Sequence, residues 1–207
     1  MGVLVSRSLP LKASEALGDE ELVRRARTGD RWGREMLYRR HAGSLLAMAA
    51  RLLSNRGEAE EVVQDTFVTA FEHLASLREP AAVRGWMGQI AVSLVRRRFR
   101  RRKLARLVGL DRGADDATLE ALADGGASAD QRAELALVDR VLRAMKAQVR
   151  IAWMLRHVEG LELTEVAALS GCSLATVKRR ISEAEAIVER HITAPERPAE
   201  DQSGAAS

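Results

Sequence analysis

The stretch from Arg84 to Arg106 constrains the fold of this chain more than any other segment. It holds nine arginine and lysine residues and no acid. Its first half has the pattern of an amphipathic helix, because Trp86, Ile90 and Leu94 recur every four residues, with Met87 and Ala91 beside them. We therefore expect one helix whose first half is buried and whose second half is held out as a positively charged rod.

The density of this positive charge favours a polyanionic partner. Like charges three or four residues apart on a helix repel each other, and each phosphate that a cation neutralises releases condensed counterions. A solvated, charged helix end is the simpler interpretation, and the charge pattern alone does not exclude it. Nucleic acid is the first candidate partner.

The composition predicts an all-α protein. Of the 207 residues 46% are apolar but only 3% are aromatic, so the core must consist mainly of Leu, Val and Ala, which favour helices over a β-sandwich or barrel. The single cysteine, Cys172, excludes a disulfide framework and a cysteine-based zinc site, and it fits a cytoplasmic location. The apolar runs are too short to span a membrane. The histidines are scattered, so we predict no metal site and no cofactor.

The net charge of +4 is unevenly distributed, and this divides the chain. Residues 107–135 carry seven acids against two arginines. Together with several glycines, this composition is typical of a flexible acidic linker. We predict two small helical domains joined by the linker. The predicted boundaries are 1–17 for a loose N-terminal tail, 18–106 for the first domain, 107–130 for the linker, 131–192 for the second domain and 193–207 for a loose C-terminal tail.

Hydrophobic periodicity predicts the other helices of both domains. Asp19 is expected to cap the first helix, and Gly29 to stop it. The predicted helices of the first domain run over 19–28, 31–53 and 58–77, and two in the second domain run over 129–146 and 149–157.

The third of these helices has two contrasting faces. Acids in its first turn, such as Glu58, Glu60 and Glu61, are favoured by the helix dipole. Gln64 and Asp65 lie too deep in the helix for that role, and from periodicity alone a solvated surface explains them. On the opposite side, the expected core positions are Val63, Phe67, Ala70, Phe71, Leu74 and Leu77.

The second domain is expected to contain a helix-turn-helix. Helices over 163–170 and 174–190 flank a turn in which Gly171 permits the left-handed conformation. Val177 is expected to pack between the helices, and Ser173 to cap the second one. An ordinary helical hairpin with a basic patch is the alternative. The residues left exposed at the start of the second helix, where a recognition helix meets DNA, are Leu174, Ala175, Thr176, Lys178, Arg179 and Arg180.

Several short motifs occur in a characteristic order and spacing. They are Asp19-Glu20-Glu21-Leu22-Val23 with Gly29-Asp30, Ala59-Glu60-Glu61-Val62-Val63-Gln64-Asp65-Thr66-Phe67, Gly85-Trp86-Met87 leading into Ile90-Ala91, and Val158-Glu159-Gly160-Leu161 leading to Thr176-Val177-Lys178. With them, residues 19–106 and 131–190 resemble bacterial sigma factors, specifically the small two-domain extracytoplasmic-function (ECF) group of the sigma-70 family.

This resemblance implies a sigma factor that binds core RNA polymerase and directs promoter recognition, DNA melting and transcription initiation. It implies no catalytic residue, because the polymerase would supply the chemistry. The face with Glu61, Gln64, Asp65 and Val68 would dock on the clamp coiled coil of the largest polymerase subunit. The implied contacts to the −10 element are Arg78, Arg84, Gln89, Ser93, Arg96, Arg97 and Arg100, and those to the −35 element are Ser173, Thr176, Lys178, Arg179 and Arg180.

The implied partners are core RNA polymerase, through its clamp coiled coil and flap region, and promoter DNA, with an anti-sigma factor as a further candidate. The acidic linker would thread near the active-site cleft and the RNA exit path. The chain departs from the family pattern at Ser93 and Arg97, where Asn and Asp are frequent. It also departs at Ser182-Glu183-Ala184-Glu185, where the end of the recognition helix is usually basic.

Two other functions are alternatives to a sigma factor. A stand-alone helix-turn-helix transcriptional regulator would bind duplex DNA by itself and would not need the face with Glu61, Gln64 and Asp65. A nuclease would hold a metal on Glu60, Glu61 and Asp65. Adjacent carboxylates on one helix, with no histidine and no second cluster, argue against such an enzyme.

Overall fold

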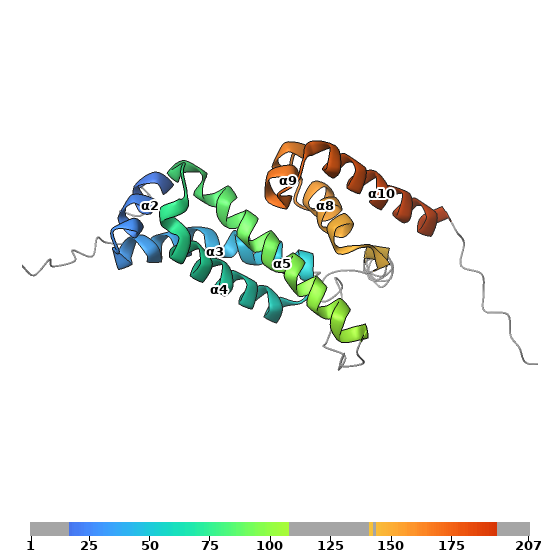
Figure 1. The fold of residues 1–207 in the computed structure, drawn as a ribbon, viewed down its shortest axis with the longest axis horizontal. Coiled ribbons are helices and arrows are strands. Elements are labelled where there is room, and N and C mark those ends of the chain that lie inside the picture. Colours follow the sequence, from blue (N-terminus) through green and yellow to red (C-terminus); the bar gives the residue numbers. More distant parts are fainter. Residues whose placement is uncertain (1–16, 108–140, 143, 194–207) are drawn as a thin grey trace, which may run out of the picture.

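The computed structural model describes residues 17–107, 141–142 and 144–193, and the regular secondary structure within these ranges is helical (Figure 1). The all-α prediction is therefore confirmed. The linker beyond residue 107, most of the helix predicted over 129–146 and the two tails apart from residues 17 and 193 lie outside the described residues.

The N-terminal domain is a bundle of three long helices, α3, α4 and α5, with the short helix α2 packed against α3 at one end (Figure 1). Leucine, valine and alanine side chains dominate its core, as the composition predicts. Its elements are α2 (Asp19–Arg27), α3 (Arg31–Leu53), α4 (Arg56–His73), the 3-10 turns η1 (Leu74–Ser76) and η2 (Pro80–Ala82), and α5 (Val83–Leu107).

The C-terminal domain contains the predicted helix-turn-helix. Helix α8 (Ala147–His157) precedes its two helices, α9 (Leu163–Ser170) and α10 (Leu174–Thr193). Gly171 has the left-handed conformation with φ of 59°, and the Ser173 hydroxyl accepts a hydrogen bond of 3.2 Å from the amide of Thr176. Val177 is fully buried. The expected roles of these three positions are confirmed.

Asp19 does not cap helix α2. Gly18 occupies the N-cap, and Asp19 is the first helical residue. Its carboxylate accepts a 2.8 Å hydrogen bond from Arg40 and lies 3.2 Å from the ring of His41. The carboxylate therefore links α2 to α3 and does not cap its own helix.

His41 is only 5% exposed. Burial lowers the pKa of its imidazole below the ordinary value, although the Asp19 carboxylate opposes this shift. The imidazole is therefore neutral near pH 7, and the Asp19–His41 contact is a hydrogen bond between a carboxylate and a neutral ring.

Helix α4 begins and ends earlier than the periodicity predicts. Asn55 caps it by accepting a 2.8 Å hydrogen bond from the amide of Glu58, which starts the helix at Arg56. After His73 the chain tightens into the turn η1. The expected core side is buried except for Phe71, which is half-buried, but the buried surface is wider than predicted because α4 packs on both α3 and α5.

The buried face of α5 includes only part of the predicted apolar side. Met87 and Ala91, expected beside the stripe, are at most 1% exposed, as are Val83 and Val95. The stripe of Trp86, Ile90 and Leu94 is half-buried at the edge of this face. Helix α5 contacts α3, α4 and the C-terminal domain. Its first half therefore carries apolar side chains on several sides. Such a helix has no single apolar stripe from which the buried face could be read.

Two glycines of α3 provide a test of the packing between α2 and α3. A Cβ atom on Gly33 would lie 2.9 Å from the Arg25 Cβ and 3.0 Å from the Ala26 amide nitrogen, whereas one on Gly43 would meet nothing within 4 Å. We expect Gly33→Ala to lower the free energy of unfolding by about 1–3 kcal/mol, because α2 must move away. The matched control Gly43→Ala should raise it by about 0.5–1 kcal/mol, because alanine favours a helix.

Urea denaturation followed by circular dichroism measures both changes. Equal stability of the two variants would show that α2 does not pack closely on α3.

Candidate nucleic-acid interface

The positive charges of α5 are divided between internal contacts and solvent. Arg96 donates a 2.9 Å hydrogen bond to the Ser170 carbonyl of the C-terminal domain. Arg102 forms a 3.0 Å ion pair with Glu58 of α4. The predicted free rod is thus wrong in part, because these arginines turn back onto neighbouring elements.

Other cations of α5 face solvent. Arg84, Arg97, Arg100, Arg101 and Lys103 are exposed, and within the described part of the chain no carboxylate forms an ion pair with any of them. Exposed guanidinium and ammonium groups of this kind are available to a polyanion such as nucleic acid.

The outer face of α4 presents a compact polar surface. Glu61, Gln64, Asp65 and Val68 are exposed, and their spacing of three and four residues puts them on one side of the helix. Val68 is 52% exposed, which is unusual for a large apolar side chain in this protein. We call these four residues the α4 face.

Arg98 of α5 organises the acids of the α4 face. Its guanidinium lies 2.5 Å from the Glu61 carboxylate and 3.4 Å from that of Asp65. Exposed ion pairs contribute roughly 0–1 kcal/mol, so both carboxylates can exchange Arg98 for another partner. Glu60 pairs instead with Arg56 of its own helix. Within the described ranges, no group of three or more His, Cys, Asp and Glu side chains could hold a metal ion.

The residues assigned to the −10 element lie along α5 and the turn before it. Arg78 is exposed between η1 and η2. On α5 the side chains of Arg84, Gln89 and Ser93 are exposed, like those of Arg97 and Arg100. Arg96 differs from them because it is half-buried against Ser170.

The residues assigned to the −35 element lie at the start of α10, but two of them have internal roles. Ser173 caps the helix. Arg180 donates a 2.7 Å hydrogen bond to the Gln148 side chain and contacts the Cys172 sulfur at 3.3 Å. Lys178 and Arg179 are exposed, and the described residues offer them no ion pair. These two are the predicted −35 cations that the structure leaves exposed.

The C-terminal domain packs directly against α5 (Figure 1). The side chain of Leu169 in α9 fills the space beside Gly88 of α5, where a Cβ atom would lie only 2.7 Å from it. Since Arg96 donates to Ser170 on the same helix α9, this contact covers part of the helix that carries the −10 candidates.

An ion pair joins the two domains at a second point. Arg51 of α3 forms a two-pronged contact with Glu159, which follows α8, at 2.5 and 2.7 Å. Because the Arg51 guanidinium donates these hydrogen bonds to the Glu159 carboxylate, its pKa is raised further above its usual value. Such planar, paired hydrogen bonds are stronger than a single contact between side chains.

A third contact inserts a buried arginine between the domains. Arg150 of α8 is 4% exposed and donates a 3.0 Å hydrogen bond to the Ser54 hydroxyl at the end of α3. Its guanidinium carbon also lies 5.2 Å from the ring centre of Phe99 in α5. Local sequence patterns do not reveal the contacts of Arg51, Glu159 and Arg150, because no periodicity links residues about a hundred positions apart.

The helices show no membrane-crossing segment among the described residues, since none is both long and apolar enough. The chain does match known families. Residues 37–105 match the family model described as Sigma-70 region 2, and residues 135–187 match the one described as Sigma-70, region 4.

Relatives with related names extend along most of the chain. It is 27% identical over 181 residues to the RNA polymerase sigma-H factor of Pseudomonas aeruginosa, which covers 83% of this chain and 92% of that protein. It is also 27% identical over 193 residues to the ECF RNA polymerase sigma-E factor of Escherichia coli (strain K12), which covers 86% of this chain and 96% of that protein.

Two solved structures resemble the whole arrangement. The structure of CnrH in complex with the cytosolic domain of CnrY has a TM-score of 0.58 and 28% identity, over 84% of this chain and 96% of that one. The sigma factor RpoE from Bartonella quintana, in complex with the anti-sigma factor NepR, has a TM-score of 0.55 and 25% identity, over 76% and 95% of the two chains.

The Arg51–Glu159 pair provides a test of the contact between the domains. We expect Arg51→Ala to remove about 1 kcal/mol from the interface, because the pair is two-pronged and Glu159 is half-buried. The radius of gyration from small-angle X-ray scattering should then increase. Arg56→Ala, which breaks a pair within α4, is the matched control and should leave the scattering unchanged. Identical scattering of Arg51→Ala and the wild type would contradict this role.

Proposed function

This chain belongs to the ECF group of the sigma-70 family. We propose that one of its exposed surfaces binds core RNA polymerase and that two others bind promoter DNA. It binds core RNA polymerase and directs promoter recognition, DNA melting and transcription initiation. The family is non-enzymatic, so the polymerase supplies the chemistry. Its proposed location is the cytoplasm, where it would meet the polymerase.

One observation carries this proposal beyond a stand-alone regulator. Both sigma regions occur in the same chain, and the first of them presents the exposed α4 face, which binding to duplex DNA alone does not require. The stand-alone helix-turn-helix regulator is therefore the disfavoured alternative.

The α4 face is the proposed polymerase-docking surface. Val68 supplies an exposed apolar contact, and Glu61, Gln64 and Asp65 surround it with acceptors and a donor. Because Arg98 already holds both carboxylates from one side, the acids are oriented before a partner arrives. Less side-chain entropy is then lost when the clamp coiled coil binds.

Helix α5 and the turn before it form the proposed −10 surface. The exposed arginines suit phosphate contacts, which position a protein on DNA, whereas amide and hydroxyl side chains suit base edges. We assign Arg78, Arg84, Gln89, Ser93, Arg96, Arg97 and Arg100 to this surface.

The start of α10 forms the proposed −35 surface. Ser173 and Thr176 lie at the N-terminus of the helix, where the amide groups and the dipole favour a phosphate. Lys178, Arg179 and Arg180 follow on the next turn. Arg180 is held by Gln148 and Cys172, so we assign it a contact that positions the helix on DNA. We assign the contact to a base edge to Arg179.

We propose that the two domains separate when the polymerase binds. In the closed arrangement α9 covers the part of α5 around Gly88 and Arg96. Promoter DNA cannot reach that part of α5 while α9 lies on it. An anti-sigma factor is a further proposed partner, since both structural neighbours were solved in complexes and one of these contains an anti-sigma factor.

The docking surface is tested by removing two of its side chains. We expect Gln64→Ala combined with Asp65→Ala to weaken binding to core RNA polymerase about tenfold, which corresponds to about 1.4 kcal/mol. Both side chains are exposed, so the fold should stay intact. Fluorescence anisotropy of the labelled protein measures the affinity, and circular dichroism checks the fold.

Glu35→Ala is the matched control, because Glu35 is an exposed acid on α3 of the same domain. Unchanged affinity of the double variant would refute the docking surface. Absence of any binding to core, together with tight and salt-sensitive binding to duplex DNA alone, would favour the stand-alone regulator.

The −35 surface is tested by comparing neighbouring cations. Arg179→Ala should cost about 1–3 kcal/mol of discrimination at one base position. Lys178→Ala should weaken all sequences alike and reduce the salt dependence of binding by about one counterion, because lysine meets phosphate. Competition binding of the holoenzyme to −35 variants at several salt concentrations measures both. Equal behaviour of the two variants would contradict the assignment.

A further inference from the structure

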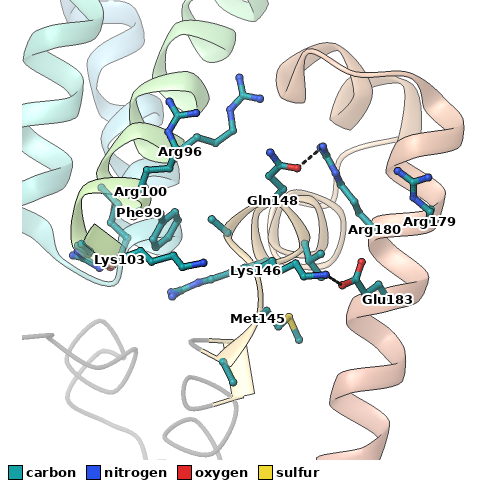
Figure 2. A pocket seen from close by; sticks show the side chains of 16 residues that line it. Arg96, Phe99, Arg100, Lys103, Met145, Lys146, Gln148, Arg179, Arg180 and Glu183 are labelled. Carbon is teal, nitrogen blue, oxygen red and sulfur yellow. Dashed lines mark hydrogen bonds and ion pairs between the residues drawn. The ribbon is translucent and has the colours of Figure 1, made fainter. Parts of the chain in front are cut away.

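A cleft between the two domains collects positive charge from both of them. Its volume is about 780 Å³. Of the sixteen described residues that line it, half are arginine or lysine and one, Glu183, is an acid. Figure 2 shows Arg96, Arg100 and Lys103 of α5 on one side and Lys146 and Gln148 of the C-terminal domain on the other.

Two of the charges on the α5 side of this cleft have no ion pair with a described carboxylate, whereas a third, Arg102, pairs with Glu58. Arg100 and Lys103 are exposed, and no described carboxylate pairs with either of them. On the opposite side Lys146 forms a 3.1 Å ion pair with Glu183, and Arg180 is held by the neutral side chain of Gln148. The closed arrangement therefore places arginine and lysine side chains of both domains around one cleft.

The first turn of α8 adds to the positive potential. Ala147, Gln148 and Val149 line the cleft, and this turn has neither an acidic residue nor a side-chain cap. The amide groups and the dipole at such a helix start favour negative charge. They reinforce the site that the arginine and lysine side chains of both domains create.

We propose that this cleft binds a compact oligophosphate anion, such as the triphosphate chain of a nucleotide, and that the bound anion ties the two domains together. A short chain of phosphates carries several negative charges and offers oxygens in several directions. It can therefore contact Arg100 and Lys103 on one side and Lys146 on the other. Guanidinium groups bind phosphate oxygens through paired hydrogen bonds.

Recognition in this cleft is through phosphate and not through a base. The one aromatic lining residue, Phe99, already stacks with Arg150 at 5.2 Å and with Arg102 at 6.0 Å. Tripolyphosphate and a nucleoside triphosphate should therefore bind with similar affinity. A marked preference for the nucleotide would assign the site to a base-reading pocket and overturn the phosphate-only assignment.

Occupation of the cleft would oppose DNA binding. Arg96, Arg100 and Arg179 line the cleft and also belong to the proposed −10 and −35 surfaces. This consequence rests on the proposed function, whereas binding of the anion does not.

The experiment is a calorimetric titration of the full chain with sodium tripolyphosphate and, separately, with ATP, at constant ionic strength. We expect saturable binding of one anion per chain. Arg100→Gln and Lys103→Gln on the α5 side, and Lys146→Gln on the opposite side, should each weaken it about tenfold, as expected for hydrogen bonds between charged groups. The matched control is Arg101→Gln, which removes the same charge from an exposed position of α5 outside the cleft.

Three results would overturn the proposal. One is the absence of saturable binding, which would also result if acidic residues of the chain itself filled the cleft. Another is equal weakening by Arg101→Gln and Arg100→Gln, which would indicate diffuse attraction to α5. The last is an unchanged affinity of Lys146→Gln, which would confine the site to one domain. Affinity for core RNA polymerase, measured on the same wild-type preparation, reports the proposed function independently.

Discussion

Helix α5 is the element on which the rest of the structure depends, because it must pack in two directions and remain positively charged. Val83, Met87, Ala91 and Val95 complete the core of the N-terminal domain. Gly88 leaves room for Leu169 of the C-terminal domain. The basic second half then supplies Arg98 to α4 and Arg100 to the cleft. One helix thus links the proposed polymerase-docking surface, the proposed −10 surface and the contact between the domains.

This arrangement explains why so many charges can be carried without acids on the same helix. The compensating carboxylates come from elsewhere in the chain, such as Glu58 and Glu61 of α4. Arg100 and Lys103 have no ion pair with a carboxylate of the described residues, and in our proposal a phosphate neutralises them. Nucleic acid and a small oligophosphate are thus alternative counterions for the same residues.

Local features of the sequence predicted local structure well. The exposed α4 face and the helix-turn-helix follow from periodicity and from the residue preferences of turns, as Gly171 and Ser173 illustrate. The predicted apolar side of α5 contained Met87 and Ala91 of the buried face, but its central stripe lies at the edge of that face, because α5 packs against more than one neighbour. The Arg51–Glu159 and Arg150–Ser54 contacts join residues 108 and 96 positions apart. Only the tertiary fold brings such residues together, and nothing in their local sequence marks them.

The most direct test of this account is the distance between the domains with and without the polymerase. Dyes on Ala75→Cys and Ala186→Cys, both exposed positions, in a chain with Cys172→Ser would report it by fluorescence energy transfer. We expect efficient transfer in the free chain and a clear loss of transfer at saturating core RNA polymerase, as the domains separate. The same high transfer in the complex would contradict the account, because the closed arrangement would then be the one that engages the polymerase.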